Sequence, residues 1–493
     1  MKRSILLLIF FAVPCIVTSC DDEASQGGAT VSSTGEITQL IEMLYTCEKE
    51  KNVVRAGYVG SVADLDKLKS EELITDFCLG AAVAGHKELV RQSLIRKADL
   101  NTALLGAVYG RQMDLAQVLL RLGANPSYGL RGAALAGHTD LVHMMLDKGA
   151  DPSSGILEAA EGGHRDICRL LLDKGAEPIF CLEGAASGGD IDLVQQMLDK
   201  GVEPSEGIYN AAKGRHMDIV LLLLSKGANP NYGLRGAAAG GHMDVVQLML
   251  EKGADPNEGL YVAAVGGHRD IVQLLLAKGA TNYGKGLEGA AWGGHMDIVL
   301  LLLNKGADPN EGLYVAAEGG HRDIVQLLLT KGATNYDKGL EGAAWGGHMD
   351  IVLLLLDKGA NPTKGISNAA RLGNTELVQL LLNKGADPNE GIYIAVSGGH
   401  LHLVQLLLDK GANPNAGLWC VAYGGHMDIV QLMLDKGATD YNAGLDGAAY
   451  GGHMDIVQLM LSKGATNLYS ALKAAEDNGH TECAEFIRAA MKK

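Results

Sequence analysis

The sequence predicts an all-α fold, an α-solenoid of about sixteen helix-pair repeats with capping helices at both ends. The first observation behind this is a 26-residue stretch, residues 285–310, that recurs with changes from about residue 76 to the end of the chain. The second is a Gly-His marker, or its histidine alone, which returns every 26 or 27 residues. The third is that each copy predicts a helix hairpin, which cannot bury its apolar face alone but can when neighbours stack.

The markers define the repeats one by one. They fall at residues 86, 112, 138, 164, 190, 216, 242, 268, 295, 321, 348, 374, 400, 426, 453 and 480, with Gln112, Asp190 and Asn374 in place of histidine. After each marker the apolar residues cover more than one face, which predicts a helix buried between neighbours. In the copy at 285–310, Asp297 and Lys305 suit the two ends of this helix dipole, and Gly306 suits its C′ position.

The first half of each repeat predicts a second, shorter helix of small residues, such as residues 287–292. Ala290 and Ala291 allow another backbone to approach closely, and Gly293 and Gly294 break the chain before the next helix. Between repeats, short loops are expected to hold five tyrosines as further contact groups: Tyr128, Tyr232, Tyr283, Tyr336 and Tyr441. The marker histidine is expected to fix the turn between the two helices.

This pattern resembles the ankyrin repeat. The letters AAEGGH at 316–321, DIV at 323–325 and KGA at 331–333 stand where that family has its two-alanine helix, its Gly-His turn and its closing Gly-Ala. The period is about seven residues shorter than the family's, and EGLY at 311–314 replaces its T-P-L-H start. The resemblance therefore implies an ankyrin-like solenoid without the β-turn finger, whose first helices line a concave face.

The chain before the repeats predicts export and a membrane anchor. In residues 1–19, Lys2 and Arg3 precede an apolar run that suits a signal peptide and is short for a membrane span. The letters VTSC at 17–20 resemble the bacterial lipoprotein cleavage box, which implies that Cys20 carries the lipid; an ordinary signal peptide or a short membrane anchor is the alternative. Residues 20–35 predict a flexible tether, 36–75 capping helices or a degenerate repeat, 76–466 the repeats, and 467–493 the last repeat with a C-terminal cap.

Charge and motifs argue against several functions. The chain carries 42 Lys and Arg against 58 Asp and Glu, a net charge of −16, which disfavours a nucleic-acid partner. The sequence holds no phosphate loop, nucleophile elbow or paired-carboxylate motif, so we expect no enzyme activity, cofactor or small-molecule substrate. Equivalent histidines in adjacent layers are too far apart to share one metal ion. Cys168 and Cys181 are expected to be small buried residues, with a disulfide between them as the alternative.

The aromatic residues of the first helices are the predicted partner-binding set. In the ankyrin family the position just after the alanine pair commonly makes contacts, and Trp and Tyr are enriched among binding hot spots. The predicted contact residues are Trp292, Glu318, Trp345, Arg371, Trp419, Tyr423 and Tyr450. The alternative is that these rings only complete the core, and packing is the favoured role for Tyr261, Tyr314 and Tyr393.

Together these features predict a non-catalytic scaffold in the bacterial cell envelope. It would be tethered through lipidated Cys20 to the inner or outer membrane and would bind protein partners on its concave face. Two alternatives remain: an ankyrin-type effector delivered to act on host proteins, and a purely structural envelope element.

Overall fold

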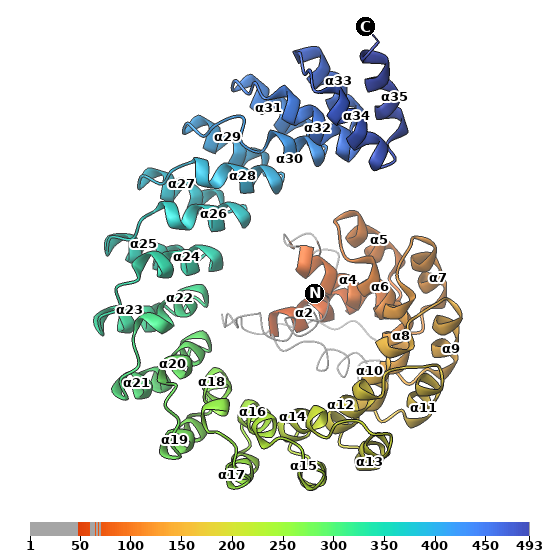
Figure 1. Ribbon diagram of the computed structural model, residues 1–493, viewed down its shortest axis with the longest axis vertical. Coiled ribbons are helices and arrows are strands. Elements are labelled where there is room, and N and C mark those ends of the chain that lie inside the picture. Colours follow the sequence, from red (N-terminus) through yellow and green to blue (C-terminus); the bar gives the residue numbers. More distant parts are fainter. Residues whose placement is uncertain (1–47, 60–64, 66–67, 69–70, 493) are drawn as a thin grey trace. The chain divides into compact units, whose positions relative to one another are not determined.

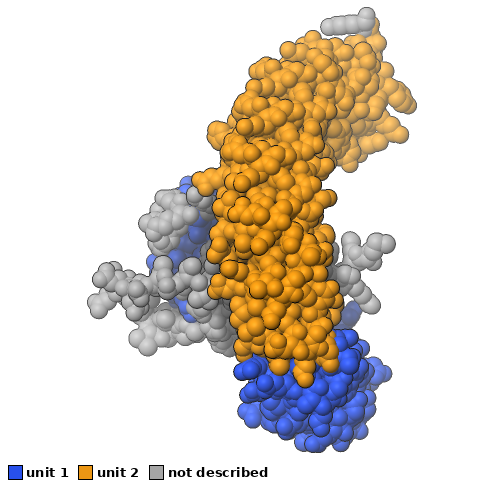
Figure 2. All heavy atoms as spheres, turned by 90° about the vertical axis from the view of Figure 1, so that its left-hand side faces the viewer, with its two compact units in different colours: residues 1–282 blue, residues 283–493 orange. Residues whose placement is uncertain are grey.

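The helices of the array run from α2 to α35 in a computed structural model that describes residues 48–59, 65, 68 and 71–492 (Figure 1). Within these residues the chain is helical throughout and contains no strand, so the predicted all-α solenoid is confirmed. The chain divides into two compact units, residues 1–282 and residues 283–493, which are called unit 1 and unit 2 below (Figure 2). Most of the capping segment predicted at residues 36–75 lies outside the described residues.

Unit 1 begins with α2, which packs against α4, and continues as helix pairs. Its helices are α2 (Glu48–Val59), α4 (Glu71–Ala84), α5 (Lys87–Ile95), α6 (Leu100–Tyr109), α7 (Met113–Arg121), α8 (Pro126–Leu135), α9 (Thr139–Asp147), α10 (Ile156–Glu161) preceded by the 3-10 helix η1 (Pro152–Ser154), α11 (Arg165–Asp173), α12 (Pro178–Gly188), α13 (Ile191–Asp199), α14 (Ser205–Lys213), α15 (Met217–Ser225), α16 (Pro230–Gly240), α17 (Met243–Glu251), α18 (Asn257–Val265) and α19 (Arg269–Ala277).

Unit 2 repeats the same hairpin. Its helices are α20 (Tyr283–Trp292), α21 (Met296–Asn304), α22 (Asn310–Glu318), α23 (Arg322–Thr330), α24 (Tyr336–Gly346), α25 (Met349–Asp357), α26 (Thr363–Arg371), α27 (Thr375–Asn383), α28 (Asn389–Ser397), α29 (Leu401–Asp409), α30 (Leu418–Tyr423), α31 (Met427–Asp435), α32 (Tyr441–Gly451), α33 (Met454–Lys463), α34 (Leu468–Asp477) and α35 (Thr481–Ala490). From α4 onward, even-numbered helices are the first helices of the repeats and odd-numbered ones the second. Within each unit the first helices form the inner side of the curved stack (Figure 1).

The second helices form as the sequence predicts. In α21, Asp297 lies in the first turn, and Ile298, Val299 and Leu302 are fully buried. Gly306 follows the helix with a φ of +97°, a left-handed conformation that glycine adopts without steric cost. Helix α22 begins at Asn310, so only residues 305–309 separate one repeat from the next.

The first helices are longer than the sequence predicted. Helix α20 has ten residues and begins at Tyr283, four residues before the predicted start, whereas α21 has nine. Capping explains the early start of several first helices: in α16 the Asn229 side chain accepts a hydrogen bond from Asn231 N, and Pro230 occupies the first turn. The placement of five tyrosines in loops is therefore wrong, since each lies in the first turn of a first helix: Tyr128, Tyr232, Tyr283, Tyr336 and Tyr441.

Glycines let neighbouring first helices approach backbone to backbone. On α16, a Cβ atom at Gly236 or Gly240 would collide with the carbonyl oxygen of Tyr209 or Lys213 on α14. The Gly-x-x-x-Gly spacing places both glycines on one face of α16, one turn apart. On α24, Gly342 and Gly346 meet α22 in the same way. The close backbone approach predicted for the first helices thus takes the form of glycine against backbone.

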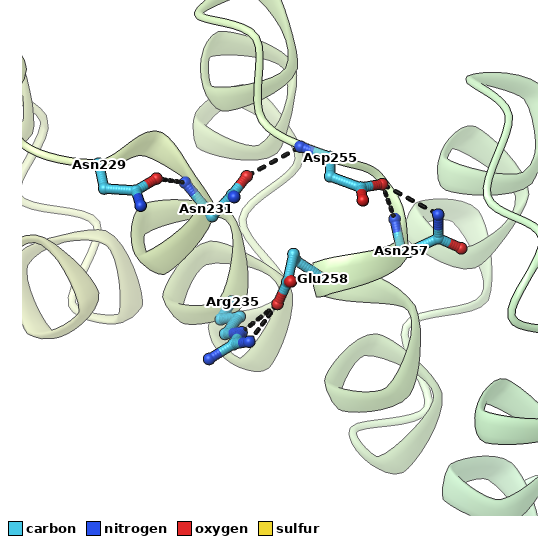
Figure 3. A network of polar contacts seen from close by, with 6 residues as sticks. All are labelled: Asn229, Asn231, Arg235, Asp255, Asn257 and Glu258. Atoms are coloured by element: carbon cyan, nitrogen blue, oxygen red, sulfur yellow. Dashed lines mark hydrogen bonds and ion pairs between the residues drawn. The ribbon is translucent and has the colours of Figure 1, made fainter.

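A polar ladder joins successive repeats through their short loops (Figure 3). Asn231 Oδ1 accepts from the backbone N–H of Asp255 at 2.8 Å, and the Asp255 carboxylate in turn caps the next helix by accepting from Asn257 N at 2.9 Å. Asn257 Oδ1 then accepts from Thr281 N at 2.8 Å. Each link between repeats spans 24 residues and satisfies a loop N–H that has no helical partner. The ladder therefore connects successive repeats through the short loops between them.

Candidate functional site

Some marker histidines connect repeats and hold the backbone of predicted contact residues in place, among them Glu318 and Tyr423. We call the residue three positions before each marker the pre-marker residue. In unit 2 the set is Trp292, Glu318, Trp345, Arg371, Ser397, Tyr423, Tyr450 and Asp477. His348 Nε2 donates to the carbonyl oxygen of Glu318 at 3.0 Å, and His453 Nε2 donates to that of Tyr423 at 2.9 Å. Besides lying at the turn of its own repeat, as the sequence predicts, the histidine ring therefore reaches the preceding layer.

Three exposed aromatic rings form one cluster on α30 and α32. The Trp419 and Tyr423 rings stack with their centroids 5.3 Å apart and an interplanar angle of 17°. The Tyr450 ring lies edge-on to Tyr423 at 5.5 Å and tilted against Trp419 at 6.1 Å. Trp419, Tyr423 and Tyr450 are nevertheless 39%, 45% and 43% exposed. The structure thus brings these three predicted residues together and leaves them accessible to a partner.

Two exposed tyrosines extend this cluster in ways that the sequence did not predict. Tyr450 also lines a shallow depression of about 620 Å³, together with α34 residues that include Tyr469 and Lys473. Tyr469 is 75% exposed. Tyr393 is 53% exposed, so the packing role favoured for it is wrong, and its hydroxyl accepts a hydrogen bond from the Cys420 thiol at 3.2 Å. Tyr261 and Tyr314, by contrast, are partly buried.

The other predicted contact residues lie on α20 to α26. Trp345 is 43% exposed, and the Arg371 guanidinium lies over its ring at 5.5 Å from the centroid. Trp292 and Glu318 are partly buried. Burial raises the pKa of the Glu318 carboxyl above its usual value, because desolvation disfavours the charged form. These residues form a second group, separated along unit 2 from the Trp419–Tyr450 cluster.

Comparison with known families decides what kind of array this is. Residues 182–259, 234–312, 287–365 and 366–444 each match the family described as ankyrin repeats in three copies, and together they cover more than half of the chain. The chain belongs to the ankyrin-repeat family. Comparison with curated proteins finds no match. Ankyrin repeats are generally non-catalytic modules of protein–protein interaction, which makes a face of exposed aromatic side chains the natural candidate for a site.

The rest of the ankyrin array offers little other chemistry. Among the described residues, no three His, Cys, Asp or Glu side chains are grouped so as to hold a metal ion. None of the helices in the described part of the chain has the length and apolarity needed to cross a membrane. Cys168 and Cys181 are buried with unbridged thiols, and the hydrogen bond between them lowers the pKa of Cys168 and raises that of Cys181. The predicted lipid site, Cys20, lies outside the described residues.

Proposed function

We propose that this ankyrin-repeat protein is a non-catalytic scaffold of the bacterial envelope that binds partner proteins through the inner face of unit 2. The short loops between repeats leave no room for projecting fingers, so the first helices would supply the contacts. A lipidated Cys20, followed by the tether at residues 20–35, would hold the array at the membrane. This anchor rests on the sequence of residues 1–20 alone.

The observation that carries the proposal is the aromatic cluster of Trp419, Tyr423 and Tyr450. Each ring retains about two fifths of its surface in water although core positions in the same helices are fully buried. Keeping large rings in water forgoes the stabilisation of burying them, roughly 25 cal/mol per Å² of apolar surface. Contiguous exposed aromatic surface of this kind is typical of protein-binding sites, where Trp and Tyr act as hot spots.

The binding role is tested by replacing the cluster. The double variant Trp419→Ala/Tyr450→Ala should lose partners that are crosslinked to the wild-type protein in its native membrane, since hot-spot truncation costs about 2 kcal/mol or more. The matched control is Leu353→Ala, because Leu353 is 39% exposed, as Trp419 is, but lies on the outer helix α25. Capture of the same partners by the double variant would contradict the proposal, provided that its circular dichroism matches that of the wild type.

The anchor is tested separately by the mass of the mature N-terminus. A diacyl- or triacyl-modified Cys20 in the membrane fraction is the expected result. An intact Met1, or an unmodified soluble chain, would contradict the anchor and favour delivery to cytoplasmic or host partners. Unchanged phenotypes for every inner-face variant would instead favour a purely structural element.

A further inference from the structure

Glu318 differs in its surroundings from the glutamates on the two neighbouring first helices, α20 and α24. On the neighbouring first helices, Glu288 forms an ion pair with Lys285 at 2.6 Å, and Glu341 forms one with Lys338 at 2.7 Å. Glu318 is partly buried on α22, between α20 and α24, yet its carboxylate makes no ion pair or hydrogen bond with the residues that the structure describes. A partly buried carboxylate without a partner is unfavourable and would gain from a cation.

The cations nearest to Glu318 in the repeat pattern already have partners. Lys285 and Lys338 pair with their own helices, Arg322 lies 3.1 Å from the Asp350 carboxylate, and Arg371 lies over the Trp345 ring. The chain as a whole carries a net charge of −16. A positive group for Glu318 would therefore come from another molecule.

Two tryptophans flank Glu318, one layer away on either side. Trp292 ends α20 and Trp345 lies in the last turn of α24, at the position equivalent to that of Glu318 in α22. His321 donates to the Trp292 carbonyl at 3.1 Å and His348 to the Glu318 carbonyl at 3.0 Å, so the next layer fixes the backbone at both positions. Arg371 already shows that a guanidinium fits against the Trp345 ring at 5.5 Å.

We propose that Trp292, Glu318 and Trp345 form a site for an arginine side chain of an extended segment in the partner protein. The inference rests on the proposed function, that this face binds proteins. Arginine suits the site better than lysine, because its planar guanidinium stacks on aromatic faces and binds a carboxylate through two parallel hydrogen bonds.

The layer spacing sets the register of such a segment. Packed helices lie about 8–10 Å apart, and an extended chain advances about 3.3 Å per residue, so about three residues span one layer. Glu318 and Tyr423 are separated by four layers, with Trp345, Arg371 and Ser397 as the pre-marker residues between them. A segment that fills the arginine site and also reaches the Trp419–Tyr450 cluster would therefore place the two contacts about twelve residues apart.

The test is calorimetric titration of the full chain with a capped peptide that has arginine at every third position. We expect saturable binding that Glu318→Gln weakens about tenfold or more, as expected for the loss of a charged hydrogen-bond partner. Glu341→Gln is the matched control, because Glu341 lies one layer away and is already paired with Lys338. Replacing arginine by its neutral isostere citrulline should weaken binding to the wild type as much, and lysine should bind less tightly than arginine.

Several outcomes would overturn the arginine site. They are an absence of saturable binding, equal affinity for the wild type and Glu318→Gln, or an equal loss in Glu341→Gln, which would indicate general attraction to an acidic surface. Partner capture in the membrane separates this inference from the proposed function. If Glu318→Gln retains the partners that Trp419→Ala/Tyr450→Ala loses, the arginine site falls and the scaffold role stands; if both variants retain them, both fall.

Discussion

Replacing Gly342 by alanine tests the backbone-to-backbone packing of the first helices. In an exposed helix, Gly→Ala stabilises by about 1 kcal/mol through helix propensity. At Gly342, however, the new Cβ would collide with the carbonyl oxygen of Tyr314, so α22 and α24 would have to move apart. Overpacking of this kind costs about 1–3 kcal/mol, and a rigid backbone obstacle favours the upper part of that range. After the gain in helix propensity is subtracted from this overpacking cost, we expect Gly342→Ala to destabilise the array by a net of about 1–2 kcal/mol.

Gly391 on α28 provides the matched control. A Cβ there would lie 3.4 Å from the nearest atoms, which belong to the side chains of Ile366 and Leu407, so it fits without displacing a backbone. Gly391→Ala should then stabilise by up to about 1 kcal/mol, the propensity gain alone. The two variants thus differ by about 2–3 kcal/mol and in sign.

Urea unfolding followed by circular dichroism, together with amide hydrogen exchange in α22 and α24, measures this difference. Exchange is needed because repeat arrays unfold region by region and a single midpoint can hide a local change. Gly342→Ala should speed exchange in α22 and α24 before it does so elsewhere in unit 2. A Gly342→Ala protein as stable as Gly391→Ala would refute the account of close backbone packing.

Two further predictions concern the links between repeats. Asn310→Ala removes the acceptor of the Thr334 and Asn335 amides, at 2.8 and 2.9 Å, so these two amides should exchange faster and stability should fall by about 1 kcal/mol; unchanged exchange would contradict a supporting role for the ladder. Burial lowers the pKa of His321 below 6.5, and the nearby His295 and His348 add to this when charged. The stabilisation that is present above pH 6.5 should therefore be lost as the pH falls through the lowered pKa of His321. In His321→Gln, the midpoint temperature of thermal unfolding should fall less steeply with decreasing pH than in the wild type. Glutamine can replace the histidine bond without titrating, as Gln112 does when it donates to Val83 O at 3.2 Å. Equal slopes of midpoint temperature against pH would contradict this.

Much of the fold follows from local pattern. The marker spacing predicts each repeat, and residues such as Asp297 and Gly306 predict where the second helices begin and end, because dipole and backbone preferences act within a few residues. The predicted first-helix start at residue 287 was wrong, because α20 begins at Tyr283. Helices α20 and α24 both begin before the small-residue stretch, at Tyr283 and Tyr336. The amino-acid composition of these first turns resembles that of a loop, so the sequence did not indicate a helix there.

The candidate site depended on the tertiary structure to a greater degree. Sequence alone indicated which pre-marker positions hold Trp, Tyr, Glu and Arg, because position within a repeat predicts position on the first helix. It did not show that Trp419, Tyr423 and Tyr450 meet, or that Tyr393 is exposed, since both depend on the distance to the next layer.

The sequence by itself therefore determined the repeat, its helices and the family, because these arise from contacts between residues close in the chain. Only the tertiary structure decided how the repeats are joined and which side chains remain unpaired. The histidine ties and the asparagine ladder connect residues 24 to 30 positions apart, and the missing ion pair at Glu318 is a property of its neighbours in two other layers. Such features depend on which groups meet across layers, and a single repeat's sequence does not contain that information.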